Sequence, residues 1–370
     1  MICLLHPFTV LLAAALVLTA CGGQEIAQEA PEPTPAAEII SDEATADATS
    51  APAEEESEET TDEAAAPESP AAASTTDFPV TVTDGDGGEH TFDAPPERVV
   101  CLIVACIENL AFLDVLPYAI DSSIYLIVID PANFGEAGAD VVQLPSGSDG
   151  PDFEAIAVAE PDLIIGGPDA RPSTENIAPL YVPLFNPEAT LEGAYHDVRM
   201  LATILGREAE AEEKLTALTD RIEAYDQLIP DDISIMVTFT LDLSELRLPG
   251  EDEFAYCWID LIADCAASEI AGNSTLEALL AVNPDKLVFI DLLDTGQTEN
   301  QLAQLAENPL WQELSAFQNN EIYVATPSTS RFTSPQAANG ALEQLVPCLF
   351  PDIFPNGSPT DEEVQEILTQ

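Results

Sequence analysis

Chemically versatile side chains are scarce in this chain, although carboxylates are abundant. Its 370 residues include 68 Asp and Glu but only nine Lys and Arg and three histidines, His6, His90 and His196. Three scattered histidines exclude the cluster of imidazoles that many zinc enzymes use. The sequence also contains no Gly-x-Ser-x-Gly, Walker or Gly-x-Gly-x-x-Gly motif. We therefore expect no catalytic residues, no resident cofactor and no directly bound metal.

The formal net charge of −59 excludes a further class of function. Binding to nucleic acid or anionic lipid through charge needs clustered Lys and Arg, which a polyanion lacks. Residues 22–77 contain 16 of the acids and no base, whereas residues 78–370 contain the other 52 acids and all nine bases. The folded part is therefore acidic too, which suits a hydrated surface in a salty habitat or simply keeps the protein soluble.

Cys21 lies in a context that predicts lipidation. Residues 8–20 form an apolar run that is too short to span a bilayer and is typical of a signal-peptide core. The run ends in Leu-Thr-Ala-Cys21, which resembles a bacterial lipobox. That resemblance implies a signal peptide over 1–20 and an acylated Cys21 that anchors the chain on the outer face of the membrane. Because no Lys or Arg precedes the run, an uncleaved anchor is the alternative.

Residues 21–77 read as a disordered acidic tether. They consist mainly of Ala, Glu, Pro, Thr and Ser, so they bury too little apolar surface to offset the entropy of an ordered chain. A flexible coil of this length reaches about 40 Å, and charge repulsion extends it further. A flexible tether suits a domain that moves relative to its anchor.

From residue 78 onward, strands alternate with helices. Residues 79–83 and 89–92 flank a turn rich in Asp and Gly, which predicts a β-hairpin. Apolar runs predict buried strands at 99–104, 124–129, 163–165, 233–239 and 286–290, and helical spacing predicts helices at 106–116, 153–159, 191–228 and 274–281. This alternation predicts parallel βαβ units.

The folded part also repeats one motif. Residues 153–167 (FEAIAVAEPDLIIGG) and 276–291 (LEALLAVNPDKLVFID) each contain Glu-Ala, a helix, Pro-Asp and then an apolar strand. The stretch 191–228 between them predicts one long helix in which Gly206 is the only weak point. Two similar halves joined by one helix predict two lobes with a cleft between them.

These pieces, in this order, resemble the class III solute-binding proteins of ABC importers, the receptors for ferric siderophores and vitamin B12. The resemblance covers about residues 80–350 and includes the Pro95-Pro96-Glu97-Arg98 segment before the first strand. It implies an α/β fold of two Rossmann-like lobes joined by one long bridging helix, with the ligand in the cleft. The expected parts are an N-terminal lobe, the bridging helix, a C-terminal lobe and a C-terminal tail, at 78–190, 191–230, 231–350 and 351–370.

The resemblance also implies a function. We expect a monomeric, lipid-anchored receptor outside the cytoplasm that captures a metal chelate (a ferric siderophore, cobalamin or haem). It would deliver this ligand to an ABC permease dimer with its ATPase. A lipid-anchored chelate or haem relay, or a sensor, is the first alternative, and a surface hydrolase is the second.

The resemblance assigns a docking role to two glutamates. Glu154 and Glu277 occupy the same position in the repeated motif, where the family carries glutamates that meet arginines of the permease. Two carboxylates on opposite lobes would make two charge-assisted contacts and fix the orientation of the receptor. The alternative is that both are ordinary acids on a helix surface.

The cysteines suggest one long-range disulfide and leave three thiols open. Cys265 and Cys348 lie where the vitamin B12 receptor of this family has a bridged pair, and an oxidising compartment permits that bond. Cys101, Cys106 and Cys257 remain. Cys101 and Cys106 bridge locally, or Cys106 and Cys257 both face the cleft, or all are buried reduced thiols.

Ligands of parallel α/β sheets bind beyond the carboxyl ends of the strands. Side chains there supply apolar area and stacking, and arginines pair with negative charge. Only Arg171, Arg247 and Arg331 are available there as bases, which weakens the case for a strongly anionic siderophore and leaves room for cobalamin, haem or a neutral or cationic chelate. Cys106 and Glu108 stand in a first loop that departs from the usual Ser-Pro-x-x-x-Glu pattern. The residues that we expect to contact the ligand are Cys106, Glu108, Tyr125, Gly167, Arg171, Arg247, Phe254, Tyr256, Trp258, Arg331 and Phe332.

Overall fold

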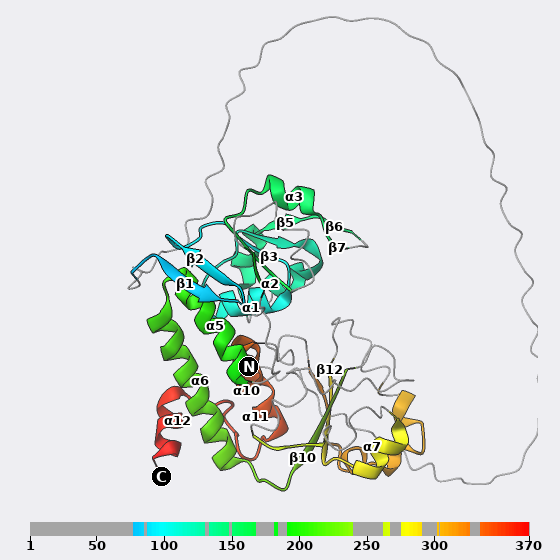
Figure 1. Ribbon diagram of the computed structural model, residues 1–370. Helices are drawn as coiled ribbons and strands as arrows, with labels where there is room; N and C mark the ends of the chain where they lie inside the picture. The colour runs from blue at the N-terminus through cyan, green and yellow to red at the C-terminus, as the bar shows by residue number, and fades with distance from the viewer. Residues whose placement is uncertain are drawn as a thin grey trace, which may run out of the picture. The chain divides into compact units, whose positions relative to one another are not determined.

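A computed structural model of the chain describes most of the region after the predicted tether (Figure 1). The described residues are 77–84, 87–129, 133–147, 150–167, 181–183, 191–239, 262–266, 275–290, 302, 304–325 and 334–369. The predicted signal peptide and Cys21, and the tether up to residue 76, lie outside these ranges. The structure therefore bears on the predicted globular part of the protein.

The first half contains a five-stranded parallel sheet with strand order β5-β4-β3-β8-β9. Two short antiparallel hairpins accompany it, and the first confirms the predicted hairpin. Its strands are β1 (Val80–Thr83), β2 (Glu89–Phe92), β3 (Val99–Cys101), β4 (Ala119–Asp121), β5 (Val142–Leu144), β6 (Ser146–Gly147), β7 (Gly150–Pro151), β8 (Leu163–Gly166) and β9 (Tyr181–Pro183). Its helical segments are α1 (Val104–Phe112), η1 (Ser122–Ile124), α2 (Tyr125–Val128), η2 (Gly135–Asp140) and α3 (Phe153–Val158).

The second half repeats this design with a four-stranded parallel sheet of order β11-β10-β12-β13. The strands are β10 (Ser234–Phe239), β11 (Asp264–Cys265), β12 (Lys286–Ile290) and β13 (Ile322–Ala325). The helical segments around it are α7 (Leu276–Val282), η7 (Trp311–Glu313) and α9 (Ser315–Gln318), and those that follow it are α10 (Pro335–Gln344), α11 (Val346–Leu349) and α12 (Asp361–Leu368). Two parallel α/β sheets confirm the predicted fold class.

The repeated Pro-Asp motif makes the same link in both halves. Each helix ends in a residue with left-handed backbone, Glu160 (φ 46°) or Asn283 (φ 52°), and proline and aspartate follow it. The Asp162 carboxylate accepts hydrogen bonds from the backbone N–H groups of residues 97 and 98, at 2.7 and 2.8 Å. The Asp285 carboxylate accepts bonds from the backbone N–H and the hydroxyl of Ser234, both at 3.0 Å. Each aspartate thus ties its own strand to the neighbouring strand that begins the sheet.

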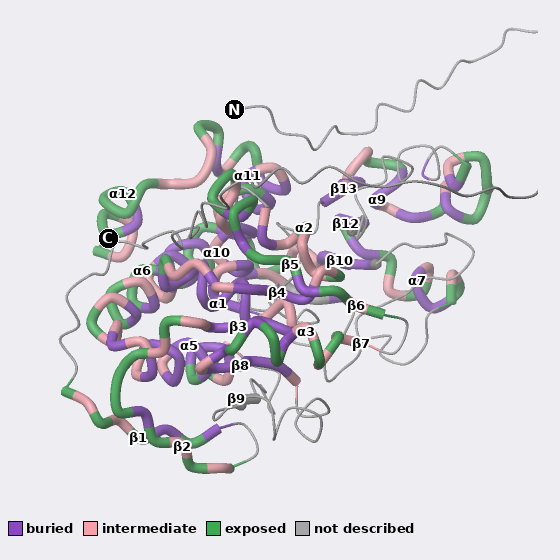
Figure 2. Tube along the Cα trace, turned by 90° about the horizontal axis from the view of Figure 1, so that it is seen from above, coloured by how far each residue is buried: buried purple, intermediate pink, exposed green. Residues whose placement is uncertain are grey.

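The apolar cores are built from these strands and the helices beside them. The side chains of β3 and β8 are almost completely buried, as the purple segments of Figure 2 show. In the second half, Leu287, Val288 and Phe289 of β12 have no exposed surface. Each sheet therefore has the two covered faces that parallel sheets require, and this explains why the strands are continuous apolar runs.

The prediction of a strand at 124–129 is wrong. The chain leaves β4 at Asp121, whose carboxylate accepts a bond from the Ser123 N–H and begins η1, and α2 follows directly. Val128 is buried, and a Cβ on Gly138 would lie 2.5 Å from its carbonyl oxygen. Leu126, by contrast, is 71% exposed. An apolar run predicted a buried strand here, but the N-cap on Asp121 and the close packing of Gly138 select a helical turn.

The predicted single helix over 191–228 is also wrong in one respect. It is two helices, α5 (Leu191–Leu205) and α6 (Glu208–Leu228), separated at Gly206, which has φ of 69°. The two helices run antiparallel, because Arg199 bonds Glu212 at 2.7 Å while Tyr195 bonds Thr219 at 3.2 Å. Only a glycine adopts this left-handed conformation without strain. The predicted weak point is therefore a tight turn.

The bridging role falls to α6 alone. Near its N-terminus, Lys214 donates to the Phe112 carbonyl oxygen, which belongs to the first half. Further along, Arg221 forms ion pairs with Glu343 and with Asp361, which follow the second sheet in the chain. Because α6 leads directly into β10, one helix joins the two halves.

The predicted C-terminal tail contains an ordered helix. α12 begins at a capping box in which Thr360 and Glu363 bond each other's backbone N–H groups. It packs against α6, and its Val364 side chain is 2% exposed. The predicted C-terminal tail over 351–370 thus includes a helix that packs on α6.

No helix in the described ranges is long and apolar enough to cross a membrane.

Burial raises the pKa of Asp197 to about 7 and generates a testable dependence of stability on pH. Asp197 lies on α5, is 5% exposed, and has His196 Nδ1 at 3.9 Å. The folded state binds the proton more tightly than the unfolded state, so this residue makes stability fall as pH rises from about 4 to about 7. At higher pH the loss stays constant, at up to about 4 kcal/mol.

We expect Asp197→Asn to remove this contribution. The free energy of unfolding of the variant, measured by urea denaturation, should exceed that of the wild type at pH 8 by more than it does at pH 5. Other groups titrate in both proteins, so the difference between the two curves is the quantity to follow. A difference that does not change between pH 5 and pH 8 would contradict the assignment.

Candidate functional site

In each sheet the chain adds strands first on one side of the opening strand and then on the other. The switch point between these two sides is where ligands bind in open α/β sheets. In the first sheet the switch lies between β3 and β8, where the Leu102 N–H donates to the Ile165 carbonyl oxygen at 2.9 Å. In the second sheet it lies between β10 and β12. The segments beyond the carboxyl ends of β8, β10, β12 and β13 lie outside the described residues, apart from Gly167. The topology thus directs the candidate site to these edges.

Most of the predicted ligand contacts fall in those segments. Their placement stays a prediction, because the structure does not describe them. These residues are Arg171, Arg247, Phe254, Tyr256, Trp258, Arg331 and Phe332.

Two of the predicted ligand-contact residues in the described part of the chain lie at the carboxyl edge of the first sheet. Gly167 follows β8 directly and is partly exposed, and a Cβ at this position would meet no atom within 4 Å. Tyr125 begins α2, just beyond the carboxyl end of β4, and is also partly exposed. Both positions allow contact with a bound molecule.

Cys106 does not have the predicted role. It forms a disulfide with Cys101, with 5.6 Å between the Cα atoms, and neither residue has exposed surface. The bond joins the last residue of β3 to the first turns of α1. Of the three possibilities for these thiols, the local bridge is the one formed. The sulfur of Cys106 is therefore not available to a ligand.

Glu108 is likewise buried, and its visible contact is structural. Its side chain accepts a hydrogen bond from the Ser334 hydroxyl at 2.8 Å, and Ser334 has no exposed surface. Ser334 is also the N-cap of α10, because its oxygen accepts from the Ala337 N–H. Glu108 thus fastens α1 to α10. Sequence reasoning missed this role, because the two residues are 226 positions apart.

Every basic side chain that the structure describes is bonded inside the protein. Arg98 donates to the carbonyl oxygens of Ala159 and Glu160 and stacks on Tyr118. Arg207 pairs with Glu210 and bonds the Leu113 carbonyl oxygen. The other described bases, with one acidic partner of each, are Arg199 (Glu212), Lys214 (Asp114), Arg221 (Glu343) and Lys286 (Glu321). Arg171, Arg247 and Arg331 are the bases outside the described ranges.

The two predicted docking glutamates occupy equivalent positions. Glu154 lies in the first turn of α3 after the N-cap Asp152, and Glu277 lies in the first turn of α7 after the N-cap Thr275. Both glutamates are exposed. The structure thus presents one carboxylate from each half at the start of a short helix.

Cys348 is disulfide-bonded. Its predicted partner, Cys265, has a side chain outside the described part, and Cys257 also lies outside it. The Cys265–Cys348 pairing therefore stays a prediction.

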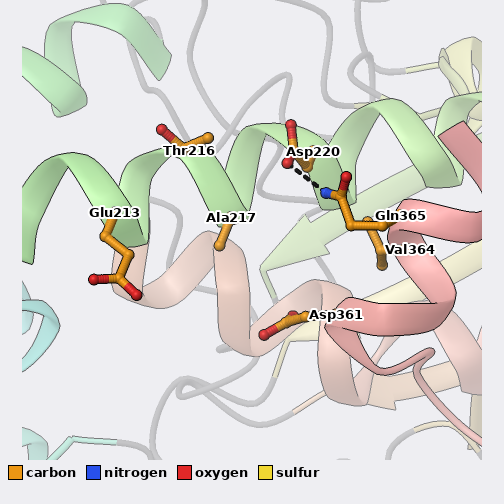
Figure 3. Close-up of a pocket in the computed structure, with 7 residues that line it drawn as sticks. All are labelled: Glu213, Thr216, Ala217, Asp220, Asp361, Val364 and Gln365. Atoms are coloured by element: carbon orange, nitrogen blue, oxygen red, sulfur yellow. Dashed lines mark hydrogen bonds between the residues drawn. The ribbon is translucent and has the colours of Figure 1, made fainter.

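A groove of about 210 Å³ lies between α6 and α12, and all of its lining residues belong to these two helices (Figure 3). Two of its acids are already bonded: Asp220 accepts from Gln365 at 2.7 Å, and Asp361 pairs with Arg221 at 2.7 Å. The described residues contain no group of three metal-binding side chains. The groove is lined by Glu213, Thr216, Ala217, Asp220, Asp361, Val364 and Gln365.

Comparison with known proteins identifies the family to which the chain belongs. A family model described as "Periplasmic binding protein" matches residues 127–329. The chain belongs to this family. The predicted resemblance is confirmed, and so is the expectation that the protein is not an enzyme, because the members of the family are substrate-binding transport proteins.

Individual relatives are distant but cover most of the folded part. YhfQ of Bacillus subtilis, provisionally named an ABC transporter substrate-binding lipoprotein, is 25% identical over 70% of this chain and 85% of its own length. The Fe(3+) dicitrate-binding periplasmic protein FecB of Escherichia coli is 24% identical over 66% of this chain and 81% of its own. The periplasmic catecholate-siderophore binding protein VctP of Vibrio cholerae superimposes with a TM-score of 0.57, at 20% identity over 73% and 99% of the two chains.

In this periplasmic binding protein, two variants can separate the stabilising effect of the Glu108–Ser334 hydrogen bond from that of ordinary helix capping. Ser334→Ala removes both the N-cap of α10 and the donor to buried Glu108, so we expect the free energy of unfolding to fall by about 2–3 kcal/mol. Thr275→Ala is the matched control, since Thr275 caps α7 at 3.3 Å without a buried acid beside it. Its expected cost is about 1 kcal/mol. Equal losses in the two variants, measured by urea denaturation, would show that the Glu108 bond adds nothing.

Proposed function

We propose that this protein is an extracytoplasmic receptor that captures a ferric chelate and delivers it to an ABC importer. The proposal rests on the positions of the basic side chains in the chain. Since the six described bases are bonded internally, Arg171, Arg247 and Arg331 are the bases left to meet a ligand. They follow the carboxyl ends of β8, β10 and β13 by five, eight and six residues. Three bases are few, but arginines at these positions in the chain would pair with an anionic chelate.

The names of the relatives favour iron among the predicted ligands. FecB is named for Fe(3+) dicitrate, and VctP is named for catecholate siderophores. Ferric complexes of both kinds present negatively charged oxygens to a receptor. Cobalamin and haem, which the sequence also suggested, serve as the comparison ligands in the test below.

Titration with ferric dicitrate, a ferric catecholate, cobalamin and haem tests this proposal. We expect native mass spectrometry to detect a one-to-one complex with a ferric chelate. Binding should quench tryptophan fluorescence through Trp258, so that Trp258→Phe abolishes the quenching. The chain has two tryptophans, and Trp311 is an internal reference, because it is 3% exposed and packs against Phe289 and Phe317.

Arginine variants sharpen the same measurement. Arg247→Ala should weaken binding of the ferric chelate about tenfold or more, because it removes a charge-assisted contact. Arg199→Ala is the matched control, since Arg199 pairs with Glu192 and Glu212 on the helices α5 and α6, and its affinity should match the wild type. Tight binding of cobalamin or haem with no ferric chelate bound would overturn the assignment of iron.

Docking to the permease would use Glu154 and Glu277. Their equivalent and exposed positions on α3 and α7 support this role, as does the steering that opposite charges give to association. The net charge of −59 requires a basic partner surface. The receptor would act as a monomer, held to the membrane by lipidated Cys21 and the tether over 21–77.

Charge reversal at both positions tests the docking role. The double variant Glu154→Arg/Glu277→Arg should abolish transport of the ferric chelate, because the carboxylates would be replaced by charges that repel the partner. Its chelate affinity should stay at the wild-type value. Loss of chelate affinity would refute a pure docking role, and undiminished transport would show that Glu154 and Glu277 are ordinary acids on a helix surface.

A further inference from the structure

The exposed faces of α3 and α7 carry more than a glutamate. On α3, Glu154, Ala157 and Val158 are exposed, and Val158 is exposed to 82%. These residues stand at positions i, i+3 and i+4, so they lie on one side of the helix. The Val158 side chain therefore lies in water beside Glu154 and does not contribute to the core.

The second half repeats this face. On α7, Glu277 and Ala281 are exposed, and Leu280 is partly exposed while also packing against the core. The spacing is again i, i+3 and i+4. Each face therefore combines one carboxylate with one small and one larger aliphatic residue.

Such a face is unusual for the outer surface of this protein. The exposed residues of α12, for comparison, are Asp361, Glu362, Glu363, Gln365 and Glu366. Other described helices also expose single aliphatic side chains, such as Leu126 on α2 at 71%, but Val158 at 82% is the most exposed large hydrophobic residue in the described ranges. Single exposed hydrophobic residues are common on proteins. Both helices, however, place aliphatic residues at i+3 and i+4 from the glutamate, with the larger one at i+4 on α3 and at i+3 on α7. A shared partner surface accounts for this arrangement.

Both helices are also held firmly. At the end of α3, Arg98 donates to the carbonyl oxygens of Ala159 and Glu160. At the end of α7, Asn283 and Ser315 exchange two hydrogen bonds, of 2.7 and 2.8 Å. Neither anchorage involves the segments beyond the carboxyl ends of the strands. The two faces are therefore preformed surfaces that do not depend on ligand contacts.

We propose that Val158 on α3, and Leu280 with Ala281 on α7, form the apolar part of the surface that docks on the permease. This inference rests on the proposed function, because it takes Glu154 and Glu277 as the charged part of the same contact. The partner surface must offer a basic side chain beside an aliphatic patch at each of two places. Burial of the aliphatic groups excludes water from each ion pair, and a desolvated pair is much stronger than one in bulk water.

The experiment uses the full-length receptor and its permease–ATPase complex from the same organism, reconstituted in lipid nanodiscs. The affinity of the receptor for the importer is measured directly, together with its affinity for the ferric chelate. Val158→Ser should weaken binding to the importer about 3- to 10-fold, and Val158→Lys more than tenfold, because lysine meets a basic partner. Chelate affinity should not change in either variant.

The control is Leu228→Ser, which removes an aliphatic side chain that is 38% exposed at the end of α6. It should bind the importer within twofold of the wild type. Thermal unfolding of all variants shows whether they are folded, and the high exposure of Val158 predicts that they are.

The outcomes separate this inference from the proposed function. If Glu154→Arg abolishes binding to the importer while Val158→Ser and Val158→Lys bind within twofold of the wild type, the apolar contact is refuted and charge docking stands. If the Val158 variants are impaired in the predicted order, the apolar contact is supported. A wild-type receptor that binds the chelate but does not bind the importer would overturn both.

Discussion

An aspartate after proline fixes the geometry of each half of this protein. Asp162 and Asp285 each accept two hydrogen bonds from the segment that leads into the first strand of the sheet. The left-handed residue before each proline turns the chain from helix to strand at the point where the aspartate can reach its donors. Once this link is made, the register of β8 on β3 and of β12 on β10 follows. The helix that precedes the proline and the carboxyl edge of the sheet are then positioned by the same contact.

The chain has only nine Lys and Arg residues, and this small number affects the contacts outside those links. Two of the described bases, Lys214 and Arg221 on α6, bind a carbonyl oxygen at the end of a helix or join helices that are far apart in the sequence. Using the few cations internally leaves the outer surface to acids. Recognition of an anionic ligand then depends on a small set of arginines, and recognition of a partner depends on that partner's own positive charge. Composition alone therefore restricts which molecules this receptor can bind.

Local pattern predicted the parts of the fold that local interactions determine. The first hairpin, the apolar strands, the helices that carry Glu154 and Glu277, and the repeat itself all follow from residue spacing within about 15 positions. The errors arise where distant contacts decide. Residues 124–129 became a helical turn because Asp121 caps it and Gly138 packs against Val128. The C-terminal helix was missed although Thr360 and Glu363 form a local capping box, and its buried Val364 packs on α6, well over 100 residues earlier in the chain. Glu108 was nominated for the ligand because no local signal pointed to Ser334.

The disulfide between Cys101 and Cys106 links the maturation of the protein to its location. The bond lies at the exit of the first strand, inside a core where neither sulfur meets solvent. Reduced thiols prevail in the cytoplasm, whereas oxidation belongs to the compartment beyond the membrane. In a reducing compartment the first βα turn would lack this covalent link. Oxidation therefore completes the N-terminal core only where the surroundings allow the bond to form.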